Sequence, residues 1–489
     1  MKILHAVHGF LPEHDGGTER YVDAIARHQI ARGYRVVLAV GSYSDRYDGF
    51  VATDRSEGRP TVYRISQLGS YAERWDHGDQ PEIEVALARL VADEAPDVVH
   101  LHHWLRLSRG IVRAVGSCGV PVVLTAHDLT ATCPRLFRVR PGEPFCQRPL
   151  AVSSCLHCVQ RDAWQDDGVV ALNIEAYATD MLAETRACTR VIAPSHAHRD
   201  VLSRFSNLPP EAITVLPHPR LAPPTPTTET TPGENTLRVA HWGHLLDYKG
   251  PHVLLDALEK LPSAVSLSLW GRADDATYRA RIEASIERLR ERGVKVDRRE
   301  SFTSDELRSM AADVAVFPSL AHESWSFVVD EALALGIPVV ASARGAPPER
   351  LGEAGATFAA GDANDLARTL EALAADRSRL EAMRRACASA GMSLDDHVER
   401  LEAIYEASRT PPKSRIPVDY GAKIAAARIR RGFEDRARWL DAMKRSAEAE
   451  LKGTRKDAED AFRKAAQEEA RLQELRQAYE RLLRSIGQS

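Results

Sequence analysis

Two glutamates, Glu323 and Glu331, stand eight positions apart in the stretch of this sequence that best combines residue types able to do chemistry. Residues 313–341 predict a βαβ unit: a short buried strand, a loop, a helix over 327–335 and a second strand. In open α/β sheets such a loop and the free amides of the next helix bind phosphate-bearing ligands, and two carboxylates there could bind sugar hydroxyls. The alternative is that Asp330 and Glu331 only complement the positive end of the helix dipole.

Lys249 lies in a loop of the same kind. Residues 237–242 predict a strand, and Gly243, His244 and Lys249 follow it before another helix. A flexible lysine beside the free amides of a helix start can bind a diphosphate.

A further predicted strand, 265–270, is followed by Gly271 and Arg272. Glycine after a strand leaves room for a ligand to approach the backbone. Because parallel strands end at a common edge of their sheet, the loops that follow them are expected to meet. The residues expected to converge there are Gly243, Lys249, Gly271, Glu323 and Glu331.

The first half of the chain offers two comparable loops. Gly16 and Gly17 follow a predicted strand over 2–7 and precede a helix, where the missing Cβ atoms would admit a ligand. His127 follows a predicted strand over 120–125. Its charge is easily set near neutral pH, so it is a candidate for a site as well as for a structural hydrogen bond.

The chain has 489 residues, 44% of them hydrophobic, which predicts two or three domains with sizeable cores. Its formal charge of -4 provides no global basic surface for nucleic acid. No run approaches the ~18 apolar residues of a membrane span, and the first residues are typical of a strand rather than a leader. We therefore expect a cytoplasmic protein, or one bound at the inner face of the plasma membrane.

Strand and helix patterns alternate through both halves of the chain and predict an α/β protein. The Pro- and Thr-rich stretch 220–236 is the expected linker between a domain over 1–219 and a domain over 237–392.

One predicted helix, near 105–117, carries Arg106, Arg109 and Arg113 on one side. This arrangement indicates either a membrane-surface patch or, with more weight, a solvated basic face.

The segment 133–158 departs from the alternating pattern and contains four of the seven cysteines. Cys155 and Cys158 form a CxxC pair, a favoured chelate for tetrahedral zinc, and Cys133 and Cys146 would complete a shell of four thiolates. Structural zinc would hold a loop that has little periodic core of its own. Unliganded thiols, disulfides and an iron–sulfur cluster are the alternatives, and no open position for a catalytic metal is implied.

Residues 420–487 contain no proline and are rich in Ala, Glu, Lys and Arg. A heptad frame runs through them, apolar at both ends and weak in the middle, where Gly453 interrupts it. One continuous helix of this length would reach ~100 Å. We expect a coiled-coil arm that forms oligomers or binds another protein, with a solvated single helix and a hairpin folded back on the chain as alternatives.

Taken together, these motifs resemble the retaining glycosyltransferases of family 4, whose GT-B fold consists of two facing Rossmann-like domains. The resemblance covers roughly residues 1–408 and implies that a helix over 393–408 returns to the first domain. Its most specific element is the pair of glutamates in Glu323-SWSFVVD-Glu331. The supporting motifs are the GGTER loop, His127 after its strand, PSHAHRDVL, GHLLDYKG, LWGR, FPS and GAPPE.

The resemblance implies roles for particular residues. Glu331 would bind the ribose hydroxyls of a sugar nucleotide, and Glu323 would contact the transferred sugar. Lys249 would neutralise the departing diphosphate, and His127 would meet the sugar or the acceptor hydroxyl. The sugar and diphosphate would be held by the amides of Trp325, Ser326, Phe327 and Val328, beside the hydroxyl of Ser324.

The remaining implied contacts come from glycine loops. Gly16 and Gly17 would let the amino-terminal loop close over the phosphates, and Gly271 would pack near the nucleoside. Many relatives carry Arg where this chain has His244, which is mostly neutral at pH 7, so Arg272 is the candidate substitute cation. The Trp325-Ser326-Phe327 spacer is bulkier than the glycine-rich version of the family and leaves the sugar open.

The expected activity is retaining transfer of a sugar from a UDP-, GDP- or dTDP-linked donor to a hydroxyl of a glycan, lipid-linked or other glycoconjugate acceptor, in surface polysaccharide biosynthesis. Negative charge develops on the diphosphate as its bond to the sugar breaks, and Lys249 with helix amides can stabilise that charge without Mg²⁺. An epimerase or phosphorylase of the same fold and a non-catalytic coiled-coil scaffold are the alternatives.

Overall fold

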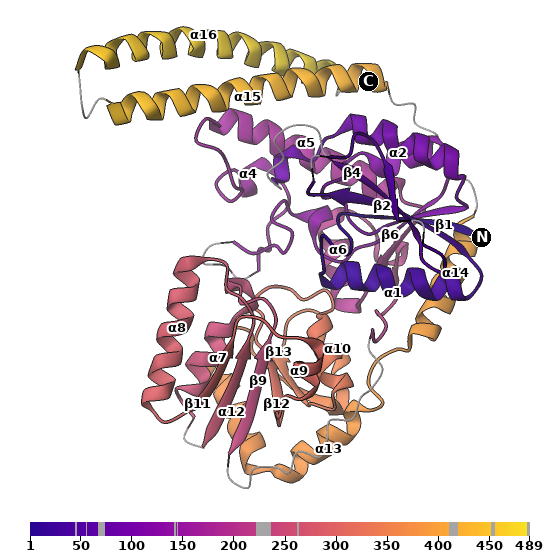
Figure 1. Ribbon diagram of the computed structural model, residues 1–489, viewed down its shortest axis with the longest axis vertical. Helices are drawn as coiled ribbons and strands as arrows, with labels where there is room; N and C mark the ends of the chain where they lie inside the picture. Colours follow the sequence, from indigo (N-terminus) through magenta and orange to yellow (C-terminus); the bar gives the residue numbers. More distant parts are fainter. Residues whose placement is uncertain are drawn as a thin grey trace.

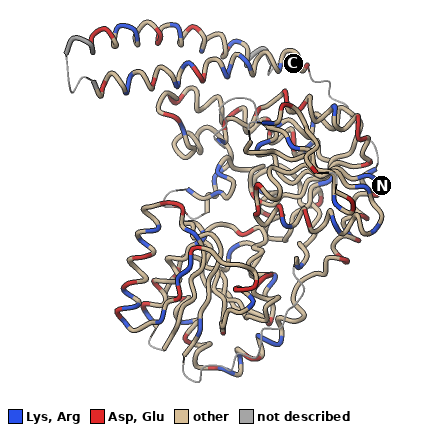
Figure 2. Tube along the Cα trace, viewed as in Figure 1, with Lys and Arg blue, Asp and Glu red and all other residues tan. Residues whose placement is uncertain are grey.

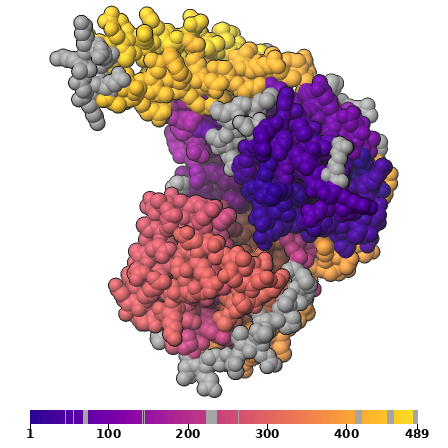
Figure 3. Space-filling model, in the orientation of Figure 1, coloured from indigo at the N-terminus to yellow at the C-terminus, as the bar shows by residue number. Residues whose placement is uncertain are grey.

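The computed structural model describes the chain except residues 45, 55, 67–73, 141–142, 144, 222–235, 262–263, 410–418, 451–454 and 487–489. Two sheets, each covered by helices, form two halves of the molecule, and a pair of long helices lies beyond the first half (Figure 1). The two halves touch on the face seen in Figure 3. Most of the predicted linker, 222–235, lies outside the described residues.

The first sheet has eight strands in the order β3-β4-β2-β1-β5-β6-β7-β8, and only β3 with β4 is an antiparallel pair. Its central strands are buried on both faces, which explains their continuous apolar runs. The strands are β1 (Lys2–Val7), β2 (Arg35–Ser42), β3 (Val51–Asp54), β4 (Thr61–Ser66), β5 (Val98–Leu101), β6 (Val122–Thr125), β7 (Arg190–Ala193) and β8 (Ile213–Val215).

The second sheet has six parallel strands in the order β11-β10-β9-β12-β13-β14. The predicted strands 237–242 and 265–270 match β9 and β10 residue for residue. The strands are β9 (Leu237–Trp242), β10 (Val265–Trp270), β11 (Lys295–Arg299), β12 (Val314–Phe317), β13 (Val339–Ser342) and β14 (Gly355–Phe358).

Helices cover both faces of each sheet, and none of those described is long and apolar enough to cross a membrane. Asp275 caps α8 by accepting a hydrogen bond from the amide of Tyr278. The helices of the first half are α1 (Gly17–Ala31), α2 (Pro81–Glu94), α3 (Ile111–Ser117), α4 (Val152–Cys155), α5 (Asp167–Ala187) and α6 (His196–Ser206). Those of the second are α7 (Pro251–Leu258), α8 (Ala276–Glu291), α9 (Ser304–Arg308), α10 (Phe327–Ala334), α11 (Pro347–Arg350), α12 (Ala363–Ala375) and α13 (Arg377–Cys387).

The helix α14 (Leu394–Ser408) packs against the first sheet although it follows the second half in sequence (Figure 1). Its His397 Nε2 lies 2.9 Å from the hydroxyl of Tyr21 in α1. The hydroxyl of Tyr405 lies 2.7 Å from Nδ1 of His100. These buried polar contacts hold α14 against β5 and α1.

The helical extension predicted over 420–487 is confirmed, and it is folded as a hairpin, which was one of the alternatives. Helices α15 (Tyr420–Glu450) and α16 (Arg455–Ile486) lie side by side in opposite directions (Figure 1). Gly453, which interrupts the heptad frame, lies outside the described residues. The frame still marks the packed face, because its buried members are Phe433, Ala437, Leu440, Ala447, Ala465 and Tyr479.

The hairpin is anchored to the first half by ion pairs. The Nζ atom of Lys423 lies 2.6 Å from Oε1 of Glu84, which is 1% exposed. Arg431 pairs with Glu82 on the same helix, α2. Charged residues of both signs run along the two hairpin helices (Figure 2), as expected for helices that are solvated on their outer faces.

The predicted basic face of Arg106, Arg109 and Arg113 is wrong. The helix begins only at Ile111, and Arg106 and Arg109 are 3% and 4% exposed. Arg109 and Arg113 both pair with Asp180 of α5. Arg109 and Arg113 therefore pair with an acid of the same domain, and Arg106 donates to the His8 carbonyl at 2.8 Å, so the three form neither a membrane patch nor a solvated face.

Candidate active site

Lys249 and Glu323 meet between two loops of the second sheet. The Nζ atom of Lys249 lies 2.8 Å from Oε1 of Glu323, which is 8% exposed. Burial opposes ionisation of the Glu323 carboxyl, but the charge of Lys249 outweighs it and holds its pKa below the ordinary value. Burial likewise opposes the charge of Lys249, but Glu323 raises the pKa of the amine. The pair is therefore ionised at neutral pH.

Two glycines let the loops around this pair approach each other. Gly250, at φ +70°, faces Pro318, and a Cβ would lie 2.2 Å from the Pro318 carbonyl oxygen. Gly345, at φ +81°, faces Glu323, and a Cβ would lie 2.1 Å from the Glu323 carbonyl oxygen. That oxygen also accepts a hydrogen bond of 2.8 Å from the amide of Ala346. The backbone of Glu323 is therefore fixed by the loop that follows β13.

Glu331 lies on α10 and faces both halves of the molecule. Its Oε2 accepts a hydrogen bond of 2.8 Å from the indole of Trp242, at the end of β9. Its Oε1 lies 3.8 Å from the guanidinium of Arg20 in α1. Burial raises the pKa of the Glu331 carboxyl above its usual value. One carboxylate oxygen thus remains available at the junction of the two halves.

The segment between the two glutamates is held by an unpredicted residue, Arg350. Its guanidinium stacks over the Trp325 ring at 3.5 Å and donates to the Ser326 carbonyl at 3.1 Å. Trp325 in turn donates to Asp330 at 2.6 Å. Asp330 therefore fixes the loop rather than only complementing the helix dipole. Ser326 adopts a left-handed conformation, φ +76°, a strained position for a residue with a Cβ.

The glycine loops of both halves converge on α10. A Cβ on Gly17 would lie 2.6 Å from the ring of Phe327, and a Cβ on Gly243 would lie 3.7 Å from Val328. Gly271, at φ +142°, leaves no room for a Cβ beside the Gly243 carbonyl. Phe327 and Val328, in the first turn of α10, therefore lie against the loops of Gly17 and Gly243.

The loop before α1 is built around a capping glutamate. The amide of Gly16 donates to the Glu19 carboxylate at 3.1 Å, the half of a capping box that a glycine N-cap can form. The imidazole nitrogens of His8 and His14 also lie 3.1 and 2.9 Å from Glu19. This cluster fixes the position of Gly17 against Phe327.

His127 is half-buried at the end of β6 and lies next to the loop of Glu323. Its carbonyl accepts a hydrogen bond of 2.5 Å from the Ser324 hydroxyl. Its ring stacks on His218, with centroids 5.0 Å apart, and meets Tyr21 edge-on. Burial lowers the pKa of His127 to about 3, so the ring is neutral at pH 7.

Two predicted contributors are exposed to solvent. His244 is exposed, and Arg272 is exposed and pairs with Asp274 at 2.5 Å. Arg272, the expected substitute cation, is therefore already paired with Asp274. Arg20, which sequence analysis did not select, lies closer to the site through its contact with Glu331.

Glu349, within the GAPPE motif, connects the two halves. Its carboxylate accepts hydrogen bonds of 2.9 and 2.8 Å from the amides of His196 and Ala197, in the first turn of α6. The hydroxyl of Ser195 donates to the Ser324 carbonyl at 3.0 Å. The PSHAHRDVL and GAPPE motifs therefore hold the halves together beside the site.

The cysteine-rich segment, 133–158, packs beside Lys249 and Glu323. The Phe137 ring stacks on Tyr248, with centroids 5.1 Å apart, and the Phe145 ring lies 5.6 Å from His322. Tyr248 and His322 are the immediate neighbours of Lys249 and Glu323. The insertion thus packs against both loops that carry the ion pair.

The four cysteines of this segment are free thiols. Burial raises the pKa of the Cys133 thiol to about 11. Among the described residues no three of the sulfurs lie within 4.8 Å of one another, so the thiols do not form a closed metal shell in this structure.

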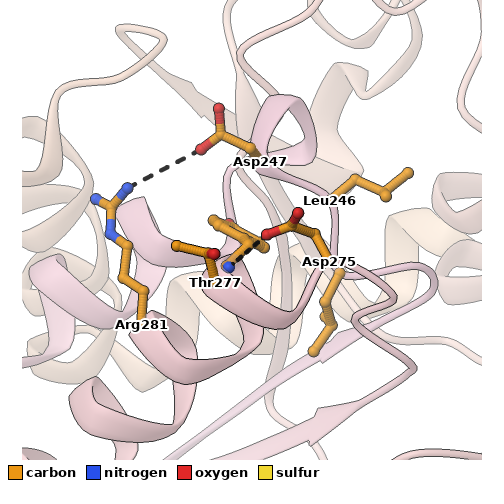
Figure 4. Close-up of a pocket in the computed structure, with 7 residues that line it drawn as sticks. Leu246, Asp247, Asp275, Thr277 and Arg281 are labelled. Carbon is orange, nitrogen blue, oxygen red and sulfur yellow. Dashed lines mark hydrogen bonds and ion pairs between the residues drawn. The ribbon is translucent and has the colours of Figure 1, made fainter. Parts of the chain in front are cut away.

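A separate pocket of about 340 Å³ opens beside α8 (Figure 4). Asp247 and Arg281 face each other across it, 4.0 Å apart. Its lining comprises Leu245, Leu246, Asp247, Asp275, Thr277, Tyr278 and Arg281. None of these is a predicted site residue, so this pocket is distinct from the Lys249–Glu323 cluster.

Comparison with known proteins agrees with this architecture. Residues 15–219 match the family model described as Glycosyltransferase Family 4, and residues 236–376 match Glycosyl transferases group 1. A phosphatidyl-myo-inositol mannosyltransferase of Mycobacterium leprae is 28% identical over 373 residues, 73% of this chain and 83% of that protein. A D-inositol 3-phosphate glycosyltransferase 1 of Catenulispora acidiphila is 27% identical over 414 residues, 80% of this chain and 91% of that protein.

Solved structures share the fold. Anabaena Alr3699/HepE, in complex with UDP-glucose, has a TM-score of 0.57 at 17% identity, covering 83% of this chain and all of that one. The two helix-covered sheets and this likeness show the GT-B fold. The first half of the chain thus carries a Glycosyltransferase Family 4 domain and the second a Glycosyl transferases group 1 domain, so the chain is a glycosyltransferase, as its motifs predict.

Proposed function

We propose that this enzyme transfers a sugar, with retention of anomeric configuration, from a nucleotide-diphosphate sugar to a hydroxyl of a glycoconjugate acceptor. The observation that carries the proposal is the ion pair of Lys249 and Glu323, which combines a cation for the diphosphate with a carboxylate for the sugar. The UDP-glucose bound to the Anabaena protein of the same fold supports a nucleotide-sugar donor.

The charges of the site account for the chemistry. When the bond between the anomeric carbon and the phosphate breaks, negative charge grows on the diphosphate and positive character grows on the sugar ring. Lys249 and the amides at the start of α10 stabilise the negative charge on the diphosphate, and Glu323 is placed to bind the sugar. These groups supply the required charge from the chain itself, so we propose that transfer needs no metal ion.

His127 is a poor general base, because burial lowers its pKa to about 3. We propose that the departing phosphate takes the proton of the acceptor hydroxyl, while His127 orients a hydroxyl of the sugar or acceptor. Glu331 would bind the ribose of a UDP-, GDP- or dTDP-linked donor through the carboxylate oxygen that Trp242 leaves available.

We propose the class of acceptor from the names of the two relatives. Both curated relatives carry an inositol in their names, so inositol phosphates and phosphatidylinositol are the first acceptors to test. A glycoconjugate of this kind agrees with a role in surface glycan assembly at the cytoplasmic face of the membrane.

The test measures release of nucleoside diphosphate from a panel of UDP-, GDP- and dTDP-sugars, with and without each acceptor. We expect release only when both a donor and an acceptor are present, and we expect it to persist in EDTA. Turnover of the donor without an acceptor would favour an epimerase or phosphorylase. Failure to bind any nucleotide sugar would favour a scaffold.

We also propose that Cys133, Cys146, Cys155 and Cys158 hold a structural zinc ion. Hydrogen bonds connect the parts of this segment, because Arg138 donates to the Cys146 carbonyl at 2.9 Å and Arg135 donates to the Cys158 carbonyl at 3.0 Å. Zinc would bind the thiolate forms and draw the sulfurs into one shell.

Native mass spectrometry of the purified enzyme tests this second proposal. We expect one zinc ion per chain, lost in Cys155→Ser but kept in a matched Cys118→Ser variant outside the segment. Metal-free wild-type protein would overturn it.

A further inference from the structure

A chain of buried side chains runs behind His127. Nε2 of His127 lies 3.1 Å from Nδ1 of His102, and Nε2 of His102 lies 3.0 Å from Nδ1 of His5. Nε2 of His5 lies 2.9 Å from Oε1 of Gln29 in α1. Gln29 and His5 are fully buried and His102 is 1% exposed, so solvent does not compete for these hydrogen bonds.

The topology of the first sheet explains the alignment. His5 belongs to β1, His102 follows β5 and His127 follows β6, and these three strands are neighbours in the sheet. The side chains therefore stand in a row toward the carboxyl edge of the sheet. The repeated histidines in HLHHW, residues 100–104, are the sequence feature that points to this row.

These histidines form a hydrogen-bonded chain rather than a metal site. The ring nitrogens of His5, His100 and His102 lie within 4.8 Å of one another, a spacing that a metal ion could bridge. His100, however, uses its nitrogens for Tyr405 and Thr125, at 2.7 and 2.8 Å. Both nitrogens of His5 and His102 belong to the chain, so no lone pair of the three rings remains for an ion.

A neutral imidazole has one donor and one acceptor nitrogen, so three hydrogen bonds in series must all point the same way. The oxygen of Gln29 faces His5 and can only accept, which makes Nε2 of His5 a donor. His102 then donates to His5, and His127 donates to His102. Nδ1 of His127 is left without its proton.

We propose that Gln29, His5 and His102 are positioning residues that hold His127 as the Nε2-H tautomer and present its unprotonated Nδ1 to a hydroxyl of the bound sugar or acceptor. This inference rests on the proposed transferase function, because it assigns a direction to a hydrogen bond in that site. Among the described residues, Nδ1 of His127 has no recorded hydrogen-bond partner.

The chain orients a proton and does not carry one away. It ends at the amide of Gln29, which cannot take up a proton under these conditions. Burial also keeps all three rings neutral, with the pKa of His5 at about 4 and that of His127 at about 3. His127 therefore acts as a fixed hydrogen-bond acceptor, and its neighbours prevent the opposite tautomer.

The direct test is ¹⁵N NMR of the full-length enzyme labelled at histidine, with the His127 signals assigned by their loss in His127→Gln. We expect a protonated Nε2 and an unprotonated Nδ1 on His127 at pH 7. In His102→Leu we expect a mixture of tautomers. A protonated Nδ1 in the wild type, or an unchanged tautomer in His102→Leu, would overturn the proposal. This readout needs no substrate, so it is independent of the proposed activity.

Kinetics provide the second test, with a matched pair of variants. His102→Leu removes the acceptor for His127, and we expect kcat to fall ~10-fold with little change in the KM for the donor, the effect of one misdirected hydrogen bond. His102→Asn places an amide where Nδ1 was, and we expect it to recover most of kcat. Equal losses in both variants, at unchanged thermal stability, would contradict a positioning role.

Discussion

The Nζ atom of Lys249 lies 2.8 Å from Oε1 of Glu323, although the two side chains come from loops after different strands, β9 and β12. These strands are neighbours in the second sheet. The pair neutralises itself in the free enzyme, and a diphosphate would share the lysine when the donor binds. Removing either partner should therefore have a distinct and measurable effect.

Lys249→Met should reduce turnover ~10²- to 10³-fold, because it removes the cation that faces the diphosphate as negative charge develops. Lys249→Arg keeps the charge and should retain more activity. Steady-state kinetics with the identified donor check this, with circular dichroism as the control for folding. Equal activity of wild type and Lys249→Met would remove Lys249 from the mechanism.

The ion pair also predicts how stability depends on pH. The folded-state pKa of Glu323 lies below its ordinary value of 4.5, so its ionisation stabilises the fold above that value and this contribution is lost as pH falls. Glu323→Gln lacks the contribution. Thermal melts should therefore show a difference between wild type and Glu323→Gln that is large at pH 7 and shrinks below pH 4.5. A constant difference would contradict an ionised Glu323.

Gly345→Ala should damage both stability and activity. Its Cβ would lie 2.1 Å from the Glu323 carbonyl oxygen and its φ of +81° is unfavourable for alanine. We expect a loss of unfolding free energy of ~2 kcal/mol or more and a fall in kcat, because Glu323 must move.

Gly293→Ala is the matched control for this prediction. Gly293 has a similar φ, +83°, but nothing lies within 4 Å of its added Cβ. It should lose ~1 kcal/mol through backbone strain alone and keep its kcat. Similar kinetic losses in both variants would show that contact with Glu323 is not the cause.

Lys423→Met should destabilise the enzyme by ~3 kcal/mol or more, because it leaves the buried carboxylate of Glu84 without its 2.6 Å partner. The double variant Lys423→Met with Glu84→Gln should recover much of the loss. Arg431→Ala, at the more exposed pair with Glu82, should cost less than ~1 kcal/mol. Denaturant unfolding of the wild type, Lys423→Met, Glu84→Gln and the double variant gives the coupling energy, and additive losses would argue that the hairpin is not anchored at Glu84.

Sequence analysis predicted the elements with strong periodicity and placed the loops at their ends. β9 and β10 match to the residue, and Glu323 precedes α10 while Glu331 lies within it, as expected. Lys249 and Glu323 each follow a parallel strand, and parallel strands end at the same edge of their sheet. Because β9 and β12 are neighbours, the two side chains meet there.

Features that depend on distant partners were not predictable in this way. Arg109 and Arg113 appeared to form a solvated face because their partner, Asp180, lies in another helix. The heptad frame is the same for a long coiled coil and for a hairpin, so periodicity alone could not choose between them. The histidine chain requires the order β1-β5-β6, which no single motif contains.

The account as a whole is tested most directly by the rate of acceptor-dependent nucleoside diphosphate release at saturating donor, compared between wild type and Glu323→Gln. We predict that the wild type releases diphosphate only with an acceptor. Glu323→Gln should bind the donor but turn over at least ~10²-fold more slowly. Equal rates in the two proteins, or a wild type that binds no nucleotide sugar, would contradict the assignment of this site to sugar transfer.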